Sequence, residues 1–125
     1  MTGIATGIDM VKIDRFRTLA PAIKTRFLTR VFTPQELEDC AGRDASLAGH
    51  FAAKEATVKA LGCGIGEVTW QDIETPLDEQ GKPVLVLHGA AQESAVRQSW
   101  FTWSVSISHT AEYAVATVSA LYEKE

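Results

Sequence analysis

The strongest hydrophobic pattern in the chain predicts a long helix from Ala45 to Leu61. Its apolar residues recur at spacings of three and four, as on the buried face of a helix: Leu47, Ala48, Phe51, Ala52, Val58 and Leu61. Asp44 is suited to cap the first turn, and Gly62 is suited to end the last. We therefore expect this helix to run through the centre of the molecule.

Three charged side chains lie within or beside the apolar face of this helix. Glu55 projects only ~40° from Phe51, and Lys54 and Lys59 share or border the same arc. A buried charge without a partner costs several kcal/mol, so we expect all three to have partners. One alternative is a weak internal pair between Glu55 and Lys59. The other is a carboxylate that binds a divalent cation, with a lysine one turn on that meets the anion bound by that cation.

A second carboxylate stands where the pattern predicts an apolar residue. The first predicted strand, Gly3 to Val11, is apolar on both faces, which is typical of a central, buried strand. Asp9 lies inside it, on the face of Gly7 and Val11. It is either a turn former or cap, or a ligand for a cation, because strands rarely bury a carboxylate without a cation or hydrogen-bond donors.

The remaining segments predict short helices and a C-terminal hairpin. Asp14 is expected to cap the first short helix, and the segment Thr33 to Glu36 carries a capping-box pattern. Helices are predicted at 15–19, 21–30, 34–40 and 90–98, and strands at 67–75, 84–87, 101–108 and 113–120. In the strand 101–108, the apolar face is predicted to consist of Phe101, Trp103, Val105 and Ile107.

Length and composition place the chain among single-domain proteins. With 125 residues, 46% of them hydrophobic, it can build one core, and we expect one domain over residues 1–125. No apolar run approaches the ~20 residues of a membrane span and no secretion pattern is present, so we expect a soluble cytoplasmic protein without a membrane partner. Cys40 and Cys63 lack the spacing of a zinc site or a disulfide framework.

The charge is unevenly distributed along the chain. A net charge of -4 argues against general nucleic-acid binding. Six of the twelve basic residues nevertheless fall between positions 12 and 30: Lys12, Arg15, Arg17, Lys24, Arg26 and Arg30. This run is either a solvated helical face or a docking surface for an acidic partner.

Four segments together resemble the holo-acyl-carrier-protein synthases, the short bacterial type of 4′-phosphopantetheinyl transferase. They are Gly7-Ile8-Asp9-Met10-Val11-Lys12-Ile13, Phe51-Ala52-Ala53-Lys54-Glu55-Ala56 with Lys59-Ala60-Leu61-Gly62, Gly64-Ile65-Gly66, and Ser106-Ile107-Ser108-His109 with Tyr113-Ala114. The resemblance spans nearly the whole chain. It implies an α+β fold in which an antiparallel sheet packs on a long central helix with short helices around it.

The resemblance also implies an activity. Members of this family transfer the 4′-phosphopantetheine arm of coenzyme A to a serine of an apo acyl carrier protein for fatty acid biosynthesis, with Mg²⁺, and release adenosine 3′,5′-bisphosphate. Asp9 and Glu55 match the metal-binding carboxylates. Glu55 and Lys59 match catalytic positions, and Lys59 either contacts the diphosphate or helps to deprotonate the serine.

Further residues match positions that contact the substrates. Those implied to bind coenzyme A are Arg43, His50, Lys59, Gly62, Gly64, Ser108 and His109. The family usually carries an arginine at position 50, implied to meet the 3′-phosphate, and a histidine there is only partly charged near neutral pH. Arg15 and Lys24 are implied to bind the acidic carrier protein, and the family implies a homotrimer. Two alternatives remain: a non-catalytic coenzyme A or nucleotide-binding module, and a metal-dependent phosphohydrolase.

Overall fold

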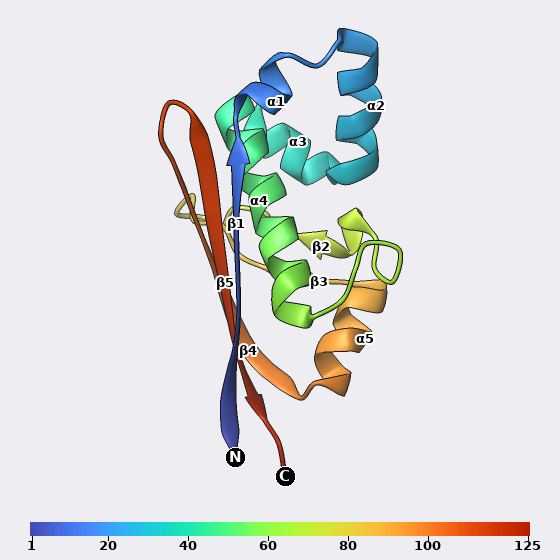
Figure 1. Cartoon of the computed structure of the whole chain (residues 1–125), viewed down its shortest axis with the longest axis vertical. Helices are drawn as coiled ribbons and strands as arrows, with labels where there is room; N and C mark the ends of the chain where they lie inside the picture. Colours follow the sequence, from blue (N-terminus) through green and yellow to red (C-terminus); the bar gives the residue numbers. More distant parts are fainter.

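A three-stranded sheet and one long helix form the centre of the structure, a computed structural model that describes residues 1–125 (Figure 1). In chain order the elements are β1 (Thr2–Lys12), α1 (Asp14–Arg17), α2 (Pro21–Val31), α3 (Pro34–Cys40), α4 (Asp44–Leu61), the 3₁₀ helix η1 (Trp70–Asp72), β2 (Ile73–Glu74), β3 (Val86–Leu87), α5 (Gly89–Arg97), β4 (Trp100–His109) and β5 (Tyr113–Glu123). This is the α+β architecture that the sequence predicts. No helix of the structure has the length and apolar character needed to cross a membrane.

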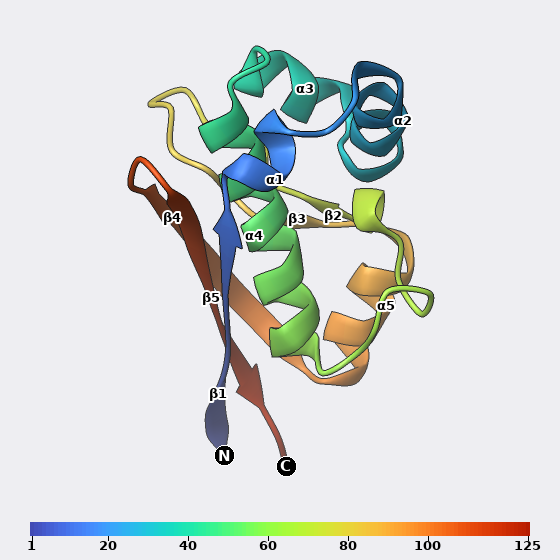
Figure 2. The same cartoon turned by 45° about the horizontal axis from the view of Figure 1, so that its top comes forward.

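The helix α4 packs along one face of the antiparallel sheet, whose strand order is β1-β5-β4. All the other helices lie on that same side, as the turned view shows (Figure 2). Contact between α4 and β1 is close at Gly7, where an added Cβ would lie 1.9 Å from the Ala56 carbonyl oxygen. Only glycine fits this position. The close contact places side chains of β1 beside those of α4, which is where the two unusual carboxylates are found.

The prediction that β1 is a central, buried strand is wrong. It is an edge strand, because the C-terminal strand β5 lies between β1 and β4 and pairs with both. Its outer face is uncovered: Ile4, Ile8 and Met10 are 66%, 59% and 63% exposed. The apolar pattern on both faces was real, but only the face of Gly7 and Val11 is buried within this chain.

Two further strand predictions need correction. Residues 67–75 do not form one strand: Thr69 and Asp72 make a reciprocal capping box around η1, and only Ile73 and Glu74 pair with β3. In β4 a register shift between Trp100 and Thr102 buries Trp100 and leaves Phe101 57% exposed. A bulge of this kind inserts one residue into the pairing, which turns the neighbouring side chain to the other face of the sheet.

The predicted helices are present, although two of their caps differ. The capping box at Thr33 and Glu36 is confirmed, and Gly62 ends α4 in the left-handed conformation with φ 69°. The predicted caps Asp44 and Asp14 are wrong, because Arg43 and Ile13 occupy the cap positions of α4 and α1 without side-chain caps. Asp44 instead accepts a hydrogen bond from Lys24 Nζ at 2.6 Å.

Candidate active site

Asp9, Glu55 and Lys59 come together where β1 runs beside α4. Lys59 Nζ donates to Asp9 Oδ1 at 3.0 Å and to the Ile8 carbonyl oxygen at 3.0 Å. Lys59 therefore contacts strand β1 and does not pair with Glu55. The predicted alternative of an ion pair between Glu55 and Lys59 within α4 is wrong. The Lys59 side chain is 54% exposed and that of Asp9 is 19% exposed, which leaves the group open to a ligand.

The electrostatics of this group favour an additional cation. Burial raises the pKa of Glu55, and the nearby Asp9 carboxylate raises it further, while Lys59 and Arg15 oppose the shift. Two carboxylates that repel each other in a partly buried site gain stability when a positive charge is placed between them. A divalent cation supplies that charge.

The residues present fit a magnesium ion better than a zinc ion. No group of three or more His, Cys, Asp or Glu side chains that could hold a metal is present, so Asp9 and Glu55 would have to hold a cation as a pair. Mg²⁺ is commonly held by one or two carboxylates and completes its coordination with water and substrate phosphates. A pair of carboxylates open to solvent is therefore a sufficient protein contribution.

Lys54, the neighbour of Glu55, faces the opposite way into the core. Its side chain is 0% exposed, and its Nζ lies 2.8 Å from Glu36 Oε1. The same nitrogen donates to the carbonyl oxygens of Trp70 and Ile73. The sequence indicated that Lys54 needs a partner, but it did not identify Glu36, because that residue lies on another helix.

His50 belongs to the same buried network. Thr75 Oγ1 donates to Glu36 Oε2 at 3.0 Å, so it accepts from His50 Nδ1 at 2.7 Å. Burial lowers the pKa of His50, which is only 6% exposed. A buried neutral imidazole is a poor ligand for a phosphate, and this geometry gives the predicted contact between His50 and coenzyme A no support.

The other residues predicted to bind coenzyme A are spread over the molecule. Arg43, at the start of α4, donates to the Asp39 carbonyl oxygen at 3.0 Å. Gly62 and Gly64 follow the other end of α4, about 27 Å away along its 18 residues. Ser108 and His109 are exposed at the end of β4. The structure does not bring these residues together within one chain.

Arg15 links the basic run to the carboxylate group. Its guanidinium lies 5.7 Å from the centre of the Phe51 ring, and Phe51 precedes Glu55 by one helical turn. Arg15 is also close enough to lower the pKa of Glu55. Lys24 is less free, because it is paired with Asp44. Arg15 therefore lies beside the carboxylates, whereas Lys24 is held by its own chain.

Comparison with known sequences places the chain in a family. A sequence profile of the 4′-phosphopantetheinyl transferase superfamily matches residues 5–118. The chain belongs to this superfamily. It is 48% identical over 117 residues to a holo-[acyl-carrier-protein] synthase of Geobacter sulfurreducens, covering 90% of this chain and 93% of that one. It is 44% identical over 122 residues to one of Herpetosiphon aurantiacus, covering 92% and 96%.

Solved structures agree with the sequence relatives. The Helicobacter pylori holo-[acyl-carrier-protein] synthase in complex with coenzyme A is similar at a TM-score of 0.82 and 35% identity, over 92% of this chain and 98% of that one. The Bacillus anthracis synthase in complex with CoA (3′,5′-ADP) gives 0.74 and 33%, over 95% and 96%. The α+β fold implied by the resemblance is thereby confirmed.

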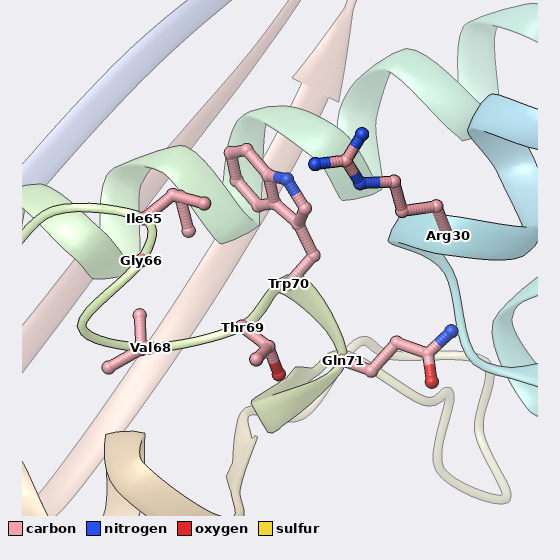
Figure 3. Close-up of a pocket in the computed structure, with 7 residues that line it drawn as sticks. All are labelled: Arg30, Ile65, Gly66, Val68, Thr69, Trp70 and Gln71. Atoms are coloured by element: carbon pink, nitrogen blue, oxygen red, sulfur yellow. The ribbon is translucent and has the colours of Figure 1, made fainter.

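Two cavities of the structure were not identified from the sequence. One, of about 480 Å³, is lined by Lys59 together with residues of β1 and β5. The other, of about 430 Å³, lies between the end of α2 and the segment 65–71 (Figure 3). The glycines at 62, 64 and 66 were the only signal in the sequence that a ligand approaches here, and by themselves they are weak evidence.

Proposed function

We propose that this chain, as one transferase domain over residues 1–125, transfers the 4′-phosphopantetheine arm of coenzyme A to a serine of an apo acyl carrier protein. The single observation that carries the proposal is the nearness of Asp9 to Glu55, whose pKa is raised by burial and by the Asp9 carboxylate, in a chain of the transferase superfamily. Relatives are named for this product, and some were solved with coenzyme A. The reaction would release adenosine 3′,5′-bisphosphate.

The mechanism assigns separate tasks to the three charged residues. Asp9 and Glu55 would hold Mg²⁺, which supplies positive charge to the diphosphate oxygens as the leaving phosphate gains negative charge. Lys59 already lies against a carboxylate oxygen, so we assign it a cationic contact to the diphosphate. Its exposed position allows its Nζ to turn from Asp9 toward a bound phosphate.

The carrier protein would dock on the basic side of α1 and α2. Arg15 is the residue of this surface that also approaches Glu55, so a carboxylate of the partner bound there would place the acceptor serine near the cation. Carrier proteins of this type are acidic, and complementary charge accelerates encounter. We infer that Arg15 contributes more to docking than Lys24, which is paired within the chain.

We also propose that three copies assemble through the uncovered face of the sheet. That face exposes Ile4, Ile8 and Met10 beside Thr6, Thr117 and Ser106, a surface suited to a second copy. Residues predicted to bind coenzyme A lie at opposite ends of α4, so a neighbouring copy would complete each site. Light scattering should give three times the chain mass of 13.6 kDa, and Ser106→Glu should dissociate the assembly. A fully active monomer would contradict this proposal.

Intact-mass spectrometry of a carrier protein tests the proposed reaction. An apo carrier incubated with coenzyme A, Mg²⁺ and the protein should gain the mass of one phosphopantetheine, and chelation of Mg²⁺ should stop the gain. A binding module would leave the carrier unchanged while still binding coenzyme A. A phosphohydrolase would consume coenzyme A in the absence of any carrier. We also propose that the protein acts in the cytoplasm without a nucleic-acid or membrane partner; its net charge of -4 argues against general nucleic-acid binding.

A further inference from the structure

The two arginines of α1 are held in different ways. Arg17 Nη1 donates to Asp14 Oδ1 at 3.0 Å, and Arg17 Nη2 donates to the Ala111 carbonyl oxygen at 3.4 Å. Arg15 is exposed like Arg17, but no ion pair of the structure includes it. Its guanidinium carbon instead lies 5.7 Å from the centre of the Phe51 ring, within the ~6 Å at which a ring face attracts a cation. An aromatic ring therefore holds Arg15, whereas a carboxylate holds Arg17.

The two kinds of contact leave different hydrogen-bond donors free. A guanidinium carries five N–H donors in one plane, and an ion pair uses those that point at its carboxylate. A ring attracts the positive charge without accepting these N–H groups as a carboxylate does, so the donors of Arg15 stay available. Arg15 can therefore form a bidentate pair with a carboxylate of another molecule while it remains in contact with Phe51.

The Phe51 ring is itself fixed by an aromatic cluster. Its centre lies 6.0 Å from that of Phe16, 5.7 Å from that of Phe27 and 5.2 Å from that of Trp70. These separations fall within the ~4.5–7 Å at which aromatic rings interact favourably. Phe51 is only 4% exposed, so its ring has little freedom to move. The contact that holds Arg15 is therefore made by a rigid group and not by a mobile side chain.

The place of this ring on α4 links it to the proposed site. Phe51 precedes Glu55 by four residues, so their Cβ atoms are neighbours on one helix face, about 5–6 Å apart. Burial raises the pKa of Glu55 and Asp9 adds to the shift, whereas Arg15 is near enough to oppose it. The ring thus keeps a cation with free donors at the border between the carboxylates and the basic side of α1 and α2.

We propose that Phe51 is a positioning residue for the transfer reaction: its ring holds the Arg15 guanidinium where that group meets a carboxylate of the carrier protein. This inference rests on the proposed function and adds the residue that sets the position of the docking arginine. A long arginine side chain loses much rotamer freedom when it binds a partner. Contact with the ring restricts Arg15 before the carrier arrives, so less freedom is lost on binding. Phe51 therefore lowers the KM for the carrier and does not affect the KM for coenzyme A.

Fluorinated phenylalanine at position 51 tests this proposal, because fluorine weakens the attraction of a ring for a cation and barely changes the volume of the ring. Mono-, di- and trifluorinated phenylalanine should raise the KM for the carrier in step with fluorination, by about two- to fivefold for the trifluorinated ring. The kcat and the KM for coenzyme A should stay as in the wild type. In an Arg15→Gln background the same series should have no effect, because the cation that the ring attracts is absent.

Phe32 provides a matched control for the fluorinated series. It is 1% exposed, and Lys54 Nζ lies 5.7 Å from its ring centre, the same distance as that of Arg15 from Phe51. Lys54 is buried and paired with Glu36, so its cation cannot meet a partner protein. Fluorination at position 32 should therefore leave both KM values unchanged. Phe51→Leu should raise the KM for the carrier as the trifluorinated ring does, and if that variant does not fold, the fluorinated series still decides.

The outcomes separate this proposal from the function on which it rests. A wild type that modifies the carrier, with a fluorinated series that leaves the KM for the carrier unchanged, would overturn the role of Phe51 while the transferase function stands. An equal rise in the Arg15→Gln background, or an equal rise at position 32, would show that fluorination acts through packing and would overturn that role as well. A wild type that leaves the carrier unmodified would overturn the proposed function and this inference together.

Discussion

Lys54 and Glu55 are neighbours in the sequence, yet α4 places their side chains in two opposite environments. Lys54 Nζ finds three acceptors, the Glu36 carboxylate and the carbonyl oxygens of Trp70 and Ile73, and its side chain is wholly buried. Glu55 lies partly exposed next to Asp9, which has the same charge. One charge is fully satisfied by its own chain and the other is not.

The difference separates a structural charge from a functional one. The Glu36 oxygens also accept from the backbone nitrogens of Thr33 and Thr75, both at 2.9 Å, so the buried network is closed. A closed network holds segments together but has no capacity left for a ligand. Asp9 has one lysine contact, from Lys59, and Glu55 forms no ion pair, which leaves room for a cation and for phosphate.

Removing the functional charge should have the largest effect on activity and almost none on folding. We expect Glu55→Gln and Asp9→Asn each to lower the transfer rate by about 10⁴-fold or more, which corresponds to about 5–6 kcal/mol of lost transition-state stabilisation. Each change also removes a repulsion, so the melting temperature should be unchanged or higher. Initial rates at limiting Mg²⁺ and thermal unfolding measure the two effects.

The matched control for this prediction is Glu93→Gln. Glu93 is an exposed carboxylate on α5, remote from β1. The Glu93→Gln substitution should alter neither the transfer rate nor its dependence on Mg²⁺. Activity of Glu55→Gln within a few-fold of the wild type would show that Glu55 has no functional role that distinguishes it from the structural Lys54.

Removing the structural charge should produce the reverse result. Lys54→Met leaves the buried Glu36 carboxylate without its cation, and we expect the free energy of unfolding to fall by about 3–5 kcal/mol. The double variant Lys54→Met/Glu36→Gln no longer buries an unpaired charge and should recover part of that loss. Chemical denaturation of both variants is the measurement. Lys54→Met as stable as the wild type would show that the network does not hold the fold.

The sequence predicted the kind of each environment more successfully than the partners within it. It identified Asp9, Lys54 and Glu55 as charges in apolar positions, because helical and strand periodicity depend only on nearby residues. It did not identify Glu36 or Thr75 as members of the network, because those contacts join segments that only the tertiary fold brings together. The same limit explains why β1 was expected in the centre of the sheet: its pairing with β5 spans nearly the whole chain.

A substitution on the proposed docking surface should have an effect of intermediate size. Arg15→Glu should raise the KM for the carrier about tenfold, about 1.4 kcal/mol, with a much smaller change for coenzyme A, because only the carrier meets this surface. Higher salt should reproduce the effect in the wild type, since exposed charges are screened over ~8–10 Å. Lys24→Glu, at a residue already paired with Asp44, should have the weaker effect. Comparable losses for both substrates would contradict this assignment.

The smallest expected effect concerns the pH dependence of the closed network. The pKa of His50 lies below its ordinary value of 6.5, because burial disfavours the charged imidazole and Lys54 adds to the effect, although Glu36 opposes it. Protonation therefore favours the unfolded chain, so the stabilising effect is complete above pH 6.5 and declines as the pH falls. At pH 5.5 the loss is at most about 1.4 kcal/mol. The free energy of unfolding, measured by denaturant titration at several pH values, should fall more steeply below pH 6.5 for the wild type than for His50→Gln. His109→Gln, at an exposed histidine, should follow the wild type. Parallel curves for the wild type and His50→Gln would show that the imidazole is not held neutral by the network.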